Sequence, residues 1–303
     1  MKKNIALTFL ATALACAPAF AQDAFKDSKE IRTAPIEQKT AIDLFHFDSS
    51  YVFESSLDNP GGYGKQDALQ TGFEYSHRFL LGGKLYLRAG FAYERFDFSS
   101  TSAPVPNHLQ SIAGVIGVDY MVGNDVGAFI QVRPGFYTEN TFDEDSFDFP
   151  ITLGRIFILQ PDKLYLFIGA NAAFLRGEYP VLPLAGLVYR PNTQWNIYAV
   201  LPEPRVTYSL NKKLDLYVGG QLIGGSYRTD RNDGIVPHKL SNAQVDYSEY
   251  RGGVGLEYHP CEAVSLNLGG GYSFLRRVNF DRAGQEYDAD PAPYVRASFR
   301  AEF

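Results

Sequence analysis

Three short stretches of the sequence contain side chains that could carry out chemistry. "GGSY" at 224–227 offers a serine nucleophile, but it lacks the Gly-x-Ser-x-Gly frame, and the surrounding pattern places Ser226 in a strand. "YHPCE" at 258–262 brings a histidine, a cysteine and a glutamate together, without the second pair of ligands that a zinc site needs. "DEDSFD" at 143–148 is acidic, but it lacks the ordered spacing and turning glycine of a calcium loop. We interpret them as a strand serine, a proline turn and a solvated loop, so the sequence predicts no enzyme, no metal site and no cofactor.

The composition is that of a β-rich protein that does not bind nucleic acid. The 303 residues include 28 glycines, 20 tyrosines and 23 phenylalanines, and the formal net charge is −6. A mildly acidic chain lacks the basic surface that nucleic-acid binding requires. No segment beyond the N-terminal region approaches the roughly 20 apolar residues of a membrane-spanning helix. Two fold classes remain, a secreted β-sandwich and an outer-membrane β-barrel.

Residues 1–21 have the three parts of a secretory signal peptide. Two lysines follow the first methionine, residues 5–17 are apolar, and Ala-Phe-Ala at 19–21 is a cleavage site. Cys16 raises a lipoprotein alternative, but the residues before it match the lipoprotein pattern poorly. The sequence therefore predicts export, with cleavage after Ala21.

The rest of the chain alternates between apolar and polar residues with the period of two that marks strands with one apolar face. In "KLYLRAGFAYERFDF" (84–98), for example, leucines, alanine, phenylalanine and tyrosine share one face, while Arg88 and Glu94 lie on the other. Several runs reach about ten residues, the length that a tilted strand needs to cross a bilayer. Tyrosines near the strand ends suit the aromatic girdles of a membrane barrel; they are Tyr137, Tyr208, Tyr247, Tyr258 and Tyr272. This pattern favours the barrel.

A polar periplasmic leader is expected at 22–39 and a barrel domain at 40–303, with about 14 strands. The strands are predicted at 40–53, 67–79, 84–97, 108–121, 126–138, 149–159, 164–175, 182–190, 194–201, 205–210, 214–229, 245–258, 263–275 and 292–303. Tight turns alternate with long loops between them, as in bacterial outer-membrane barrels, with the turns and both chain ends in the periplasm. The sequence thus predicts an all-β, antiparallel up-and-down transmembrane β-barrel. Pro202 and Pro204 could instead kink one longer strand, which leaves twelve strands as the alternative.

One segment, residues 182–228, also carries a family resemblance. Its distinctive residues are Pro183, Gly186, Tyr189-Arg190-Pro191-Asn192, Trp195, Pro202, Pro204, Tyr208 and Gly224-Gly225-Ser226-Tyr227. With these residues the segment resembles an uncharacterised family of bacterial outer-membrane β-barrels, a domain of unknown function. The resemblance covers this segment well and most of the remaining chain loosely. It implies the architecture and the location, and it carries over no catalytic residues.

The polar face of the predicted strands would point into the barrel lumen. The polar residues on this face are Lys84, Arg88, Glu94, Gln131, Arg133, Glu249, Arg251, Glu257, Arg296, Arg300 and Glu302. In an open barrel they would line a wet pore and bias which solutes pass. Because both signs of charge are interspersed, they could instead pair and plug the barrel. Four of the arginines have fewer fixed carboxylates adjacent to them, which favours contact with anionic solutes; they are Arg133, Arg251, Arg296 and Arg300.

The final strand, "YVRASFRAEF", ends on an aromatic residue at Phe303. Phe299 and Phe303 resemble the C-terminal signal by which the barrel-assembly machinery recognises its substrates, and the last strand must pair with the first to remove free edges. The leading hypothesis is a passive channel or porin-like transporter of small solutes in the outer membrane, with lipid and the assembly machinery as partners. The alternative is a non-conducting barrel that acts through its extracellular loops. A barrel hydrolase is a remote third.

Overall fold

The computed structural model describes residues 42–58, 62–122, 125–177, 179–232 and 234–303. The predicted signal peptide with Cys16 and the predicted leader at 22–39 lie outside these residues. Within the described ranges, no helix is long and apolar enough to cross a membrane. The helical elements found there are three short 3-10 turns, η2 (Glu144–Ser146), η3 (His238–Leu240) and η4 (Asp281–Ala283). The described chain is therefore built from strands, turns and loops.

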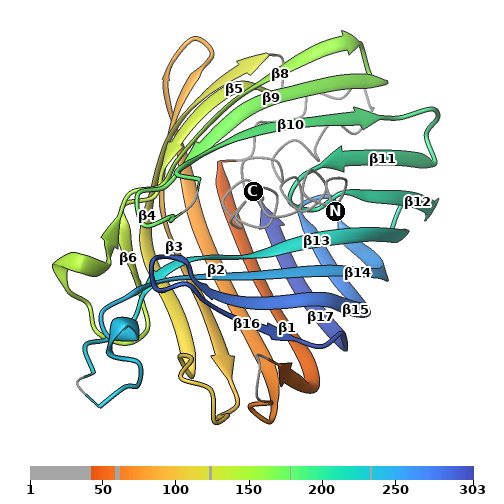
Figure 1. The fold of residues 1–303 in the computed structure, drawn as a ribbon. Helices are drawn as coiled ribbons and strands as arrows, with labels where there is room; N and C mark the ends of the chain where they lie inside the picture. The colour runs from red at the N-terminus through yellow and green to blue at the C-terminus, as the bar shows by residue number, and fades with distance from the viewer. Residues whose placement is uncertain (1–41, 59–61, 123–124, 178, 233) are drawn as a thin grey trace, which may run out of the picture.

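The strands form a closed antiparallel barrel whose wall contains 14 strands (Figure 1). Closure is achieved by the pairing of the first and last strands, from Leu44 opposite Glu302 to Val52 opposite Tyr294. At the end of this seam the backbone N–H of Phe303 donates to the carbonyl of Asp43 at 2.9 Å. The wall strands are β1 (Asp43–Asp58), β2 (Lys65–Gly82), β3 (Leu85–Phe98), β4 (His108–Val122), β5 (Asp125–Val132), β8 (Ile151–Gln160), β9 (Leu164–Ala172), β10 (Val181–Tyr189), β11 (Trp195–Val200), β12 (Arg205–Asn211), β13 (Leu214–Arg228), β14 (Gln244–Cys261), β15 (Val264–Phe280) and β17 (Ala292–Glu302). The predicted fold class is confirmed.

The segment that left the strand count open forms a short hairpin. β11 and β12 pair from Trp195 opposite Tyr208 to Tyr198 opposite Arg205. Pro202 and Pro204 lie in the turn between the two strands, so the alternative of a single kinked strand, and with it the count of twelve, is wrong. The last residue of β11, Val200, pairs with Gly186 in the middle of β10. The hairpin consequently stops partway along its neighbour.

Three short strands supplement the wall at the end that carries the long loops. β6 (Gly135–Thr138) continues β5 after Pro134, pairs with β4 and meets the end of β13, where Thr138 lies opposite Arg228. β7 (Phe147–Asp148) pairs with β6. β16 (Gln285–Ala289) pairs with β15 and with the end of β1. Two predictions need correction. The strand predicted at 126–138 is broken at Pro134, because proline has no N–H to donate to the neighbouring strand. The loop expected after residue 275 is mostly strand, because β15 continues to Phe280 and β16 follows.

These additional pairings narrow the barrel at the long-loop end. Among the described residues, β1, β2, β3, β4, β6, β13, β14, β15 and β16 form a closed ring of nine strands there. A barrel of about eight strands has an interior that side chains just fill. The ring is filled in this way by the ring core, whose buried residues include Val52, Phe96, Phe98, Leu109, Tyr137, Tyr227, Leu240, Val245, Tyr247, Val278, Phe280 and Tyr287. The wider remainder of the barrel lies between this core and the short-turn end.

Two tyrosines that the sequence placed in an aromatic girdle belong to the ring core. Tyr137 and Tyr247 are only 2% and 1% exposed. Tyr247 lies against Phe96, with ring centroids 4.8 Å apart, and against Phe98 at 5.1 Å. The girdle assignment is wrong for these two because the ring is narrow enough to need large inward side chains. Leu240, in the loop between β13 and β14, is fully buried in the same core.

The outer face of the barrel is apolar. Exposed large apolar side chains occur on most wall strands; they include Phe47, Phe91, Ile112, Ile116, Ile130, Leu153, Ile168, Leu187, Leu216, Val218, Val254, Leu268, Phe274 and Val295. Trp195 and Tyr208 pair near the short-turn end, with ring centroids 4.9 Å apart. A soluble protein would not expose so large a continuous apolar surface. A lipid environment explains the pattern.

We expect Gly90→Ala in β3 to lower the free energy of unfolding by about 1–3 kcal/mol, the usual effect of overpacking. A Cβ at this position would lie 2.0 Å from the carbonyl oxygen of Tyr75 on β2, so the backbone would have to move. Gly114→Ala on the adjacent strand is the matched control, because its Cβ would meet no atom closer than 3.8 Å. Urea unfolding in detergent micelles measures both. Equal stability of the two variants would contradict this account.

Candidate functional site: the barrel lumen

Buried ion pairs line the inner face of the wall, where every second residue of each strand points. On β2, β3 and β4, a carboxylate oxygen of Asp119 lies 2.7 Å from Nη2 of Arg88 and 3.0 Å from Nε of Arg78. All three side chains are only 2% exposed. Charges this deeply buried are tolerated when they are paired and hydrogen-bonded. Arg88, one of the predicted lumen residues, is thus held against the wall by its ion pair with Asp119.

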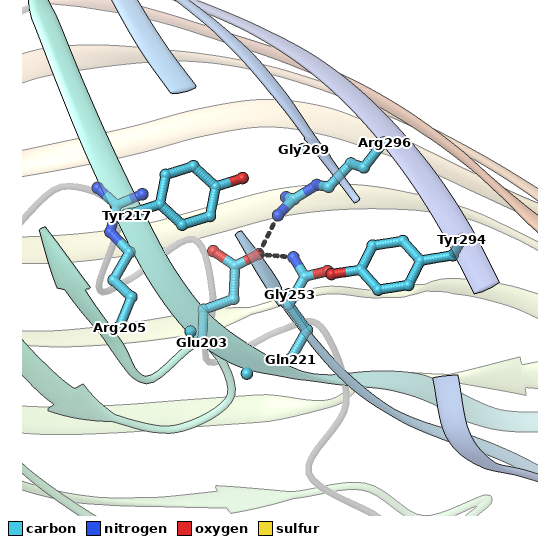
Figure 2. Close-up of a pocket in the computed structure, with 10 residues that line it drawn as sticks. Glu203, Arg205, Tyr217, Gln221, Gly253, Gly269, Tyr294 and Arg296 are labelled. Carbon is cyan, nitrogen blue, oxygen red and sulfur yellow. Dashed lines mark hydrogen bonds and ion pairs between the residues drawn. The ribbon is translucent and has the colours of Figure 1, made fainter. Parts of the chain in front are cut away.

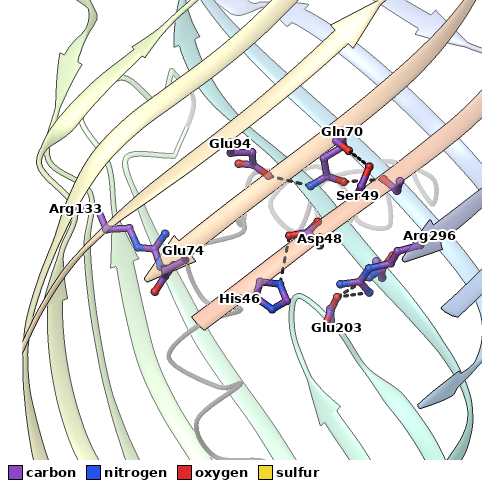
Figure 3. Close-up of polar contacts among 11 residues, drawn as sticks. His46, Asp48, Ser49, Gln70, Glu74, Glu94, Arg133, Glu203 and Arg296 are labelled. Atoms are coloured by element: carbon purple, nitrogen blue, oxygen red, sulfur yellow. Dashed lines mark hydrogen bonds and ion pairs between the residues drawn. The ribbon is translucent and has the colours of Figure 1, made fainter. Parts of the chain in front are cut away.

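A second set of polar contacts joins β1, β2, β3 and the residue that follows β5 (Figure 3). Arg133 Nη2 lies 2.6 Å from Oε2 of Glu74. Gln70 donates to Glu94 at 3.0 Å and accepts from the hydroxyl of Ser50 at 3.0 Å. Two predicted lumen residues, Arg133 and Glu94, are therefore held by partners that lie far away in the sequence.

Arg251 and Glu249, neighbours on the inner face of β14, form the most buried pair. Arg251 Nε lies 2.7 Å from Oε1 of Glu249, and the two side chains are 1% and 0% exposed. Arg251 also donates to the hydroxyl of Ser50 at 2.6 Å, and its guanidinium lies 5.1 Å from the ring centroid of Tyr294. The Glu249 carboxylate accepts from the hydroxyl of Tyr247 at 2.9 Å. This pair thus connects the polar lumen to the ring core.

A pocket opens in the lumen wall between β12, β13, β14, β15 and β17 (Figure 2). Glu203, from the turn between β11 and β12, pairs with Nη1 of Arg296 at 2.8 Å and accepts a hydrogen bond from the Gln221 amide. Arg205 lines the same pocket and lies 3.1 Å from the carboxylate of Glu257. The remaining lining consists of Tyr217, Gly219, Gly220, Gly253, Gly269 and Tyr294. The pocket thus combines cations, one turn carboxylate and two tyrosine rings.

The structure changes the reasoning about anionic solutes. The four arginines singled out for contact with anionic solutes all have a carboxylate within 4 Å; the pairs are Arg133–Glu74, Arg251–Glu249, Arg296–Glu203 and Arg300–Glu302. The expected shortage of carboxylates is therefore wrong. Glu249 and Glu302 lie two residues away on the same strands as their arginines, Glu74 lies on β2, and Glu203 lies in the turn between β11 and β12. Lys84 lies exposed in the turn between β2 and β3 rather than in the lumen. A role for Arg88, Glu94, Arg133, Glu249, Arg251, Arg296 or Arg300 in solute selection stays a prediction.

The opposite sector of the lumen wall is apolar. Inward side chains of β4, β5, β8, β9, β10 and β11 form one buried cluster of Met121, Val126, Phe129, Tyr165, Phe167, Leu184, Val188, Tyr198 and Val200, with Tyr86 and Ile156 packed against it. The ring of Phe167 lies over Gly154 and Gly169, where a Cβ would approach it within 2.2 and 2.6 Å. The lumen consequently has one apolar wall and one charged wall.

The three stretches singled out for chemistry are integrated into the wall and the loops. Ser226 lies within β13. His259 Nε2 lies 3.3 Å from Asp215, and Cys261 is exposed at the end of β14. Asp143 caps η2, and hydrogen bonds from Asn242 and Arg231 lower the pKa of Asp145 in the same loop. Among the described residues no group of three or more His, Cys, Asp or Glu side chains could hold a metal ion.

Sequence reasoning missed the acids that complete the site. Glu74 and Asp119 lie on the polar faces of their strands, and a count of polar alternation on β2 and β4 would have found them. Glu203 gives no such signal, because it lies in a turn and no period applies to it. The apolar inner wall was missed because alternation alone does not say which face of a strand points inward.

Comparison with known proteins assigns no family to the chain. No family model matches, and no curated protein matches. An outer-membrane channel from Pseudomonas putida F1 is 10% identical, with a TM-score of 0.47 over 90% of this chain and 98% of that one. The Pseudomonas putida toluene transporter TodX is 12% identical, with a TM-score of 0.45 over 86% and 90%. The translocator domain of the Neisseria meningitidis autotransporter NalP is 9% identical, with a TM-score of 0.38 over 94% and 96%. Similarities this weak do not identify a function.

Proposed function

We propose that the protein is an outer-membrane β-barrel that acts as a passive channel for small solutes, with no chemical step. The observation that carries the proposal is the inverted distribution of side chains: apolar residues cover the outside of a closed barrel, and ionisable residues line part of its inside. A barrel of this width has more interior than wall side chains can fill. The pocket around Glu203 and Arg296 lies in the described part of this interior.

The proposed location and orientation follow from the same features. Export by the predicted signal peptide at 1–21 and cleavage before the leader at 22–39 would deliver the chain to the periplasm. The lipid-facing side chains require a bilayer, and the long-loop end, which carries the ring core, would face the cell exterior. Phe299 and Phe303 remain our proposed recognition signal for the assembly machinery.

A specific observation favours a second candidate, a barrel that does not conduct and acts through its loops. The ring core fills the long-loop end, and Leu240 of the β13–β14 loop is part of it. Among the described residues, this loop is also held by contacts between Arg231, Asn242 and Asp145. An ordered, packed outer end could serve as a binding surface for another molecule, as well as a barrier to solutes.

Swelling of liposomes that contain the refolded mature protein separates the two candidates. Isosmotic arabinose, glucose and raffinose report permeability as a function of solute size. A channel with a narrow outer end is expected to pass arabinose faster than raffinose, and to pass both faster after residues 231–241 are replaced by a Gly-Ser linker. If both the wild type and the linker variant fold correctly, and liposomes with either protein swell no faster than liposomes without protein, the non-conducting barrel would be favoured.

A further inference from the structure

The carboxylate of Glu203 differs from the other acids that pair with lumen arginines. Glu74, Asp119 and Glu249 belong to strands, so their positions are fixed by the ladder. Glu203 lies between two prolines in the turn of the short β11–β12 hairpin, which stops partway up the wall. Its side chain reaches from this turn into the lumen pocket (Figure 2).

The turn itself is anchored independently of the Glu203 side chain. The N–H of Gly220 donates to the carbonyl of Pro204 at 2.8 Å, and the N–H of Leu222 donates to that of Pro202 at 2.9 Å. Rotation of the Glu203 side chain could therefore release Arg296 and Gln221 without breaking a backbone hydrogen bond.

The groups that hold Glu203 are those that would recognise a foreign carboxylate. A guanidinium and an amide N–H both donate charge-assisted hydrogen bonds to a carboxylate, because the acceptor is ionised in each case. The rings of Tyr217 and Tyr294 lie on either side of Glu203 (Figure 2). Glycines make room for them, because a Cβ at Gly269 would come within 2.5 Å of the Tyr217 hydroxyl and one at Gly253 within 2.6 Å of the Tyr294 hydroxyl.

We propose that Arg296 and Gln221 form a binding site for the carboxylate of a small aromatic acid, and that Glu203 occupies this site as an internal substitute when no solute is bound. The inference rests on the proposed channel function and adds its solute class. An entering carboxylate displaces Glu203 and takes over its contacts with Arg296 and Gln221, while the two tyrosine rings flank the aromatic ring of the solute. Transit past this point is then an exchange of one carboxylate for another, so the arginine is paired throughout.

Calorimetric titration of benzoate into the refolded mature protein, in a non-ionic detergent, tests the site. Because Glu203→Gln removes the competing charge, we expect it to bind benzoate at least tenfold more tightly than the wild type. Arg296→Gln should lose binding altogether. Benzamide, which has the same shape without the charge, should show no gain in any variant. Glu302→Gln, which alters a lumen acid on β17, is the matched control and should leave benzoate affinity unchanged.

A second substitution at the same position keeps the test valid if Glu203→Gln folds poorly. Glu203→Ala leaves Arg296 without the Glu203 carboxylate, and benzoate should raise its Tm by binding the folded state, while benzamide should not. The idea is overturned if Glu203→Gln and Glu203→Ala fold and neither gains affinity for benzoate over the wild type. It is equally overturned if benzamide gains as much as benzoate. Because binding in micelles requires no conduction, this result is distinguishable from failure of the channel proposal.

Discussion

Replacement of Asp119 by alanine is expected to lower the free energy of unfolding by about 3–5 kcal/mol, the cost of leaving a buried charge without its partner. The Asp119 side chain is 2% exposed, and one of its oxygens faces the guanidinium groups of both Arg78 and Arg88. Its removal would leave two cations close together on the inner face of β2 and β3, with water largely excluded. Burial makes their mutual repulsion strong.

Urea unfolding followed by the fluorescence of the single tryptophan, Trp195, measures the effect in micelles. Glu54→Gln is the matched control, since Glu54 pairs with Lys65 at 3.6 Å in an exposed position where both side chains are more than half accessible. Exposed pairs contribute about 0–1 kcal/mol. If the Asp119 variant were as stable as the Glu54 variant, the lumen arginines would not depend on this acid, and the description of the wall would be wrong.

Tyr247→Ala is expected to have two effects, a loss of about 3–5 kcal/mol in the free energy of unfolding and a rise in permeability. Tyr247 is fully buried against Phe96 and Phe98, and its hydroxyl donates to Glu249. Alanine would leave a cavity in the ring core where the barrel is narrowest. Because that core closes the long-loop end, the same cavity should ease the passage of small solutes.

Tyr272→Ala on β15 is the control for the Tyr247 variant. Tyr272 is 52% exposed on the lipid-facing side of the neighbouring strand, so its removal should alter liposome swelling little. A faster rate for Tyr247→Ala with an unchanged rate for Tyr272→Ala would assign the barrier to the ring core. Equal rates in the two variants would place the barrier elsewhere in the molecule.

The barrel could be predicted because its causes are local and periodic. The alternation in 84–98 or 263–275 directly indicates strands with two different faces, and the lengths of the connections indicate which end is which. The hairpin at 195–211 was harder, because Pro202 and Pro204 are compatible with a kink as well as with a turn. The antiparallel pairing of 195–198 with 205–208 distinguishes the two.

The partners within the lumen could not be predicted in the same way. Arg133 and Glu74 are 59 residues apart, and their contact depends on how the sheet curves across β2, β3, β4 and β5. The ring core depends on the contact between β6 and the end of β13, where Thr138 pairs with Arg228. The alternation of residues along the strands does not predict this pairing. Alternation assigns residues to faces, whereas closure of the barrel decides which distant residues meet.

Single-channel recording of the refolded mature protein in a planar lipid bilayer tests the central claim most directly. The account predicts discrete current steps that are small for a barrel of this width, because the ring core narrows the outer end, and larger steps for Tyr247→Ala. Correct folding is verified by heat-modifiable migration on a gel before each recording. Silence from both proteins, once folded and inserted, would contradict the channel and leave the loops as the functional part of the molecule.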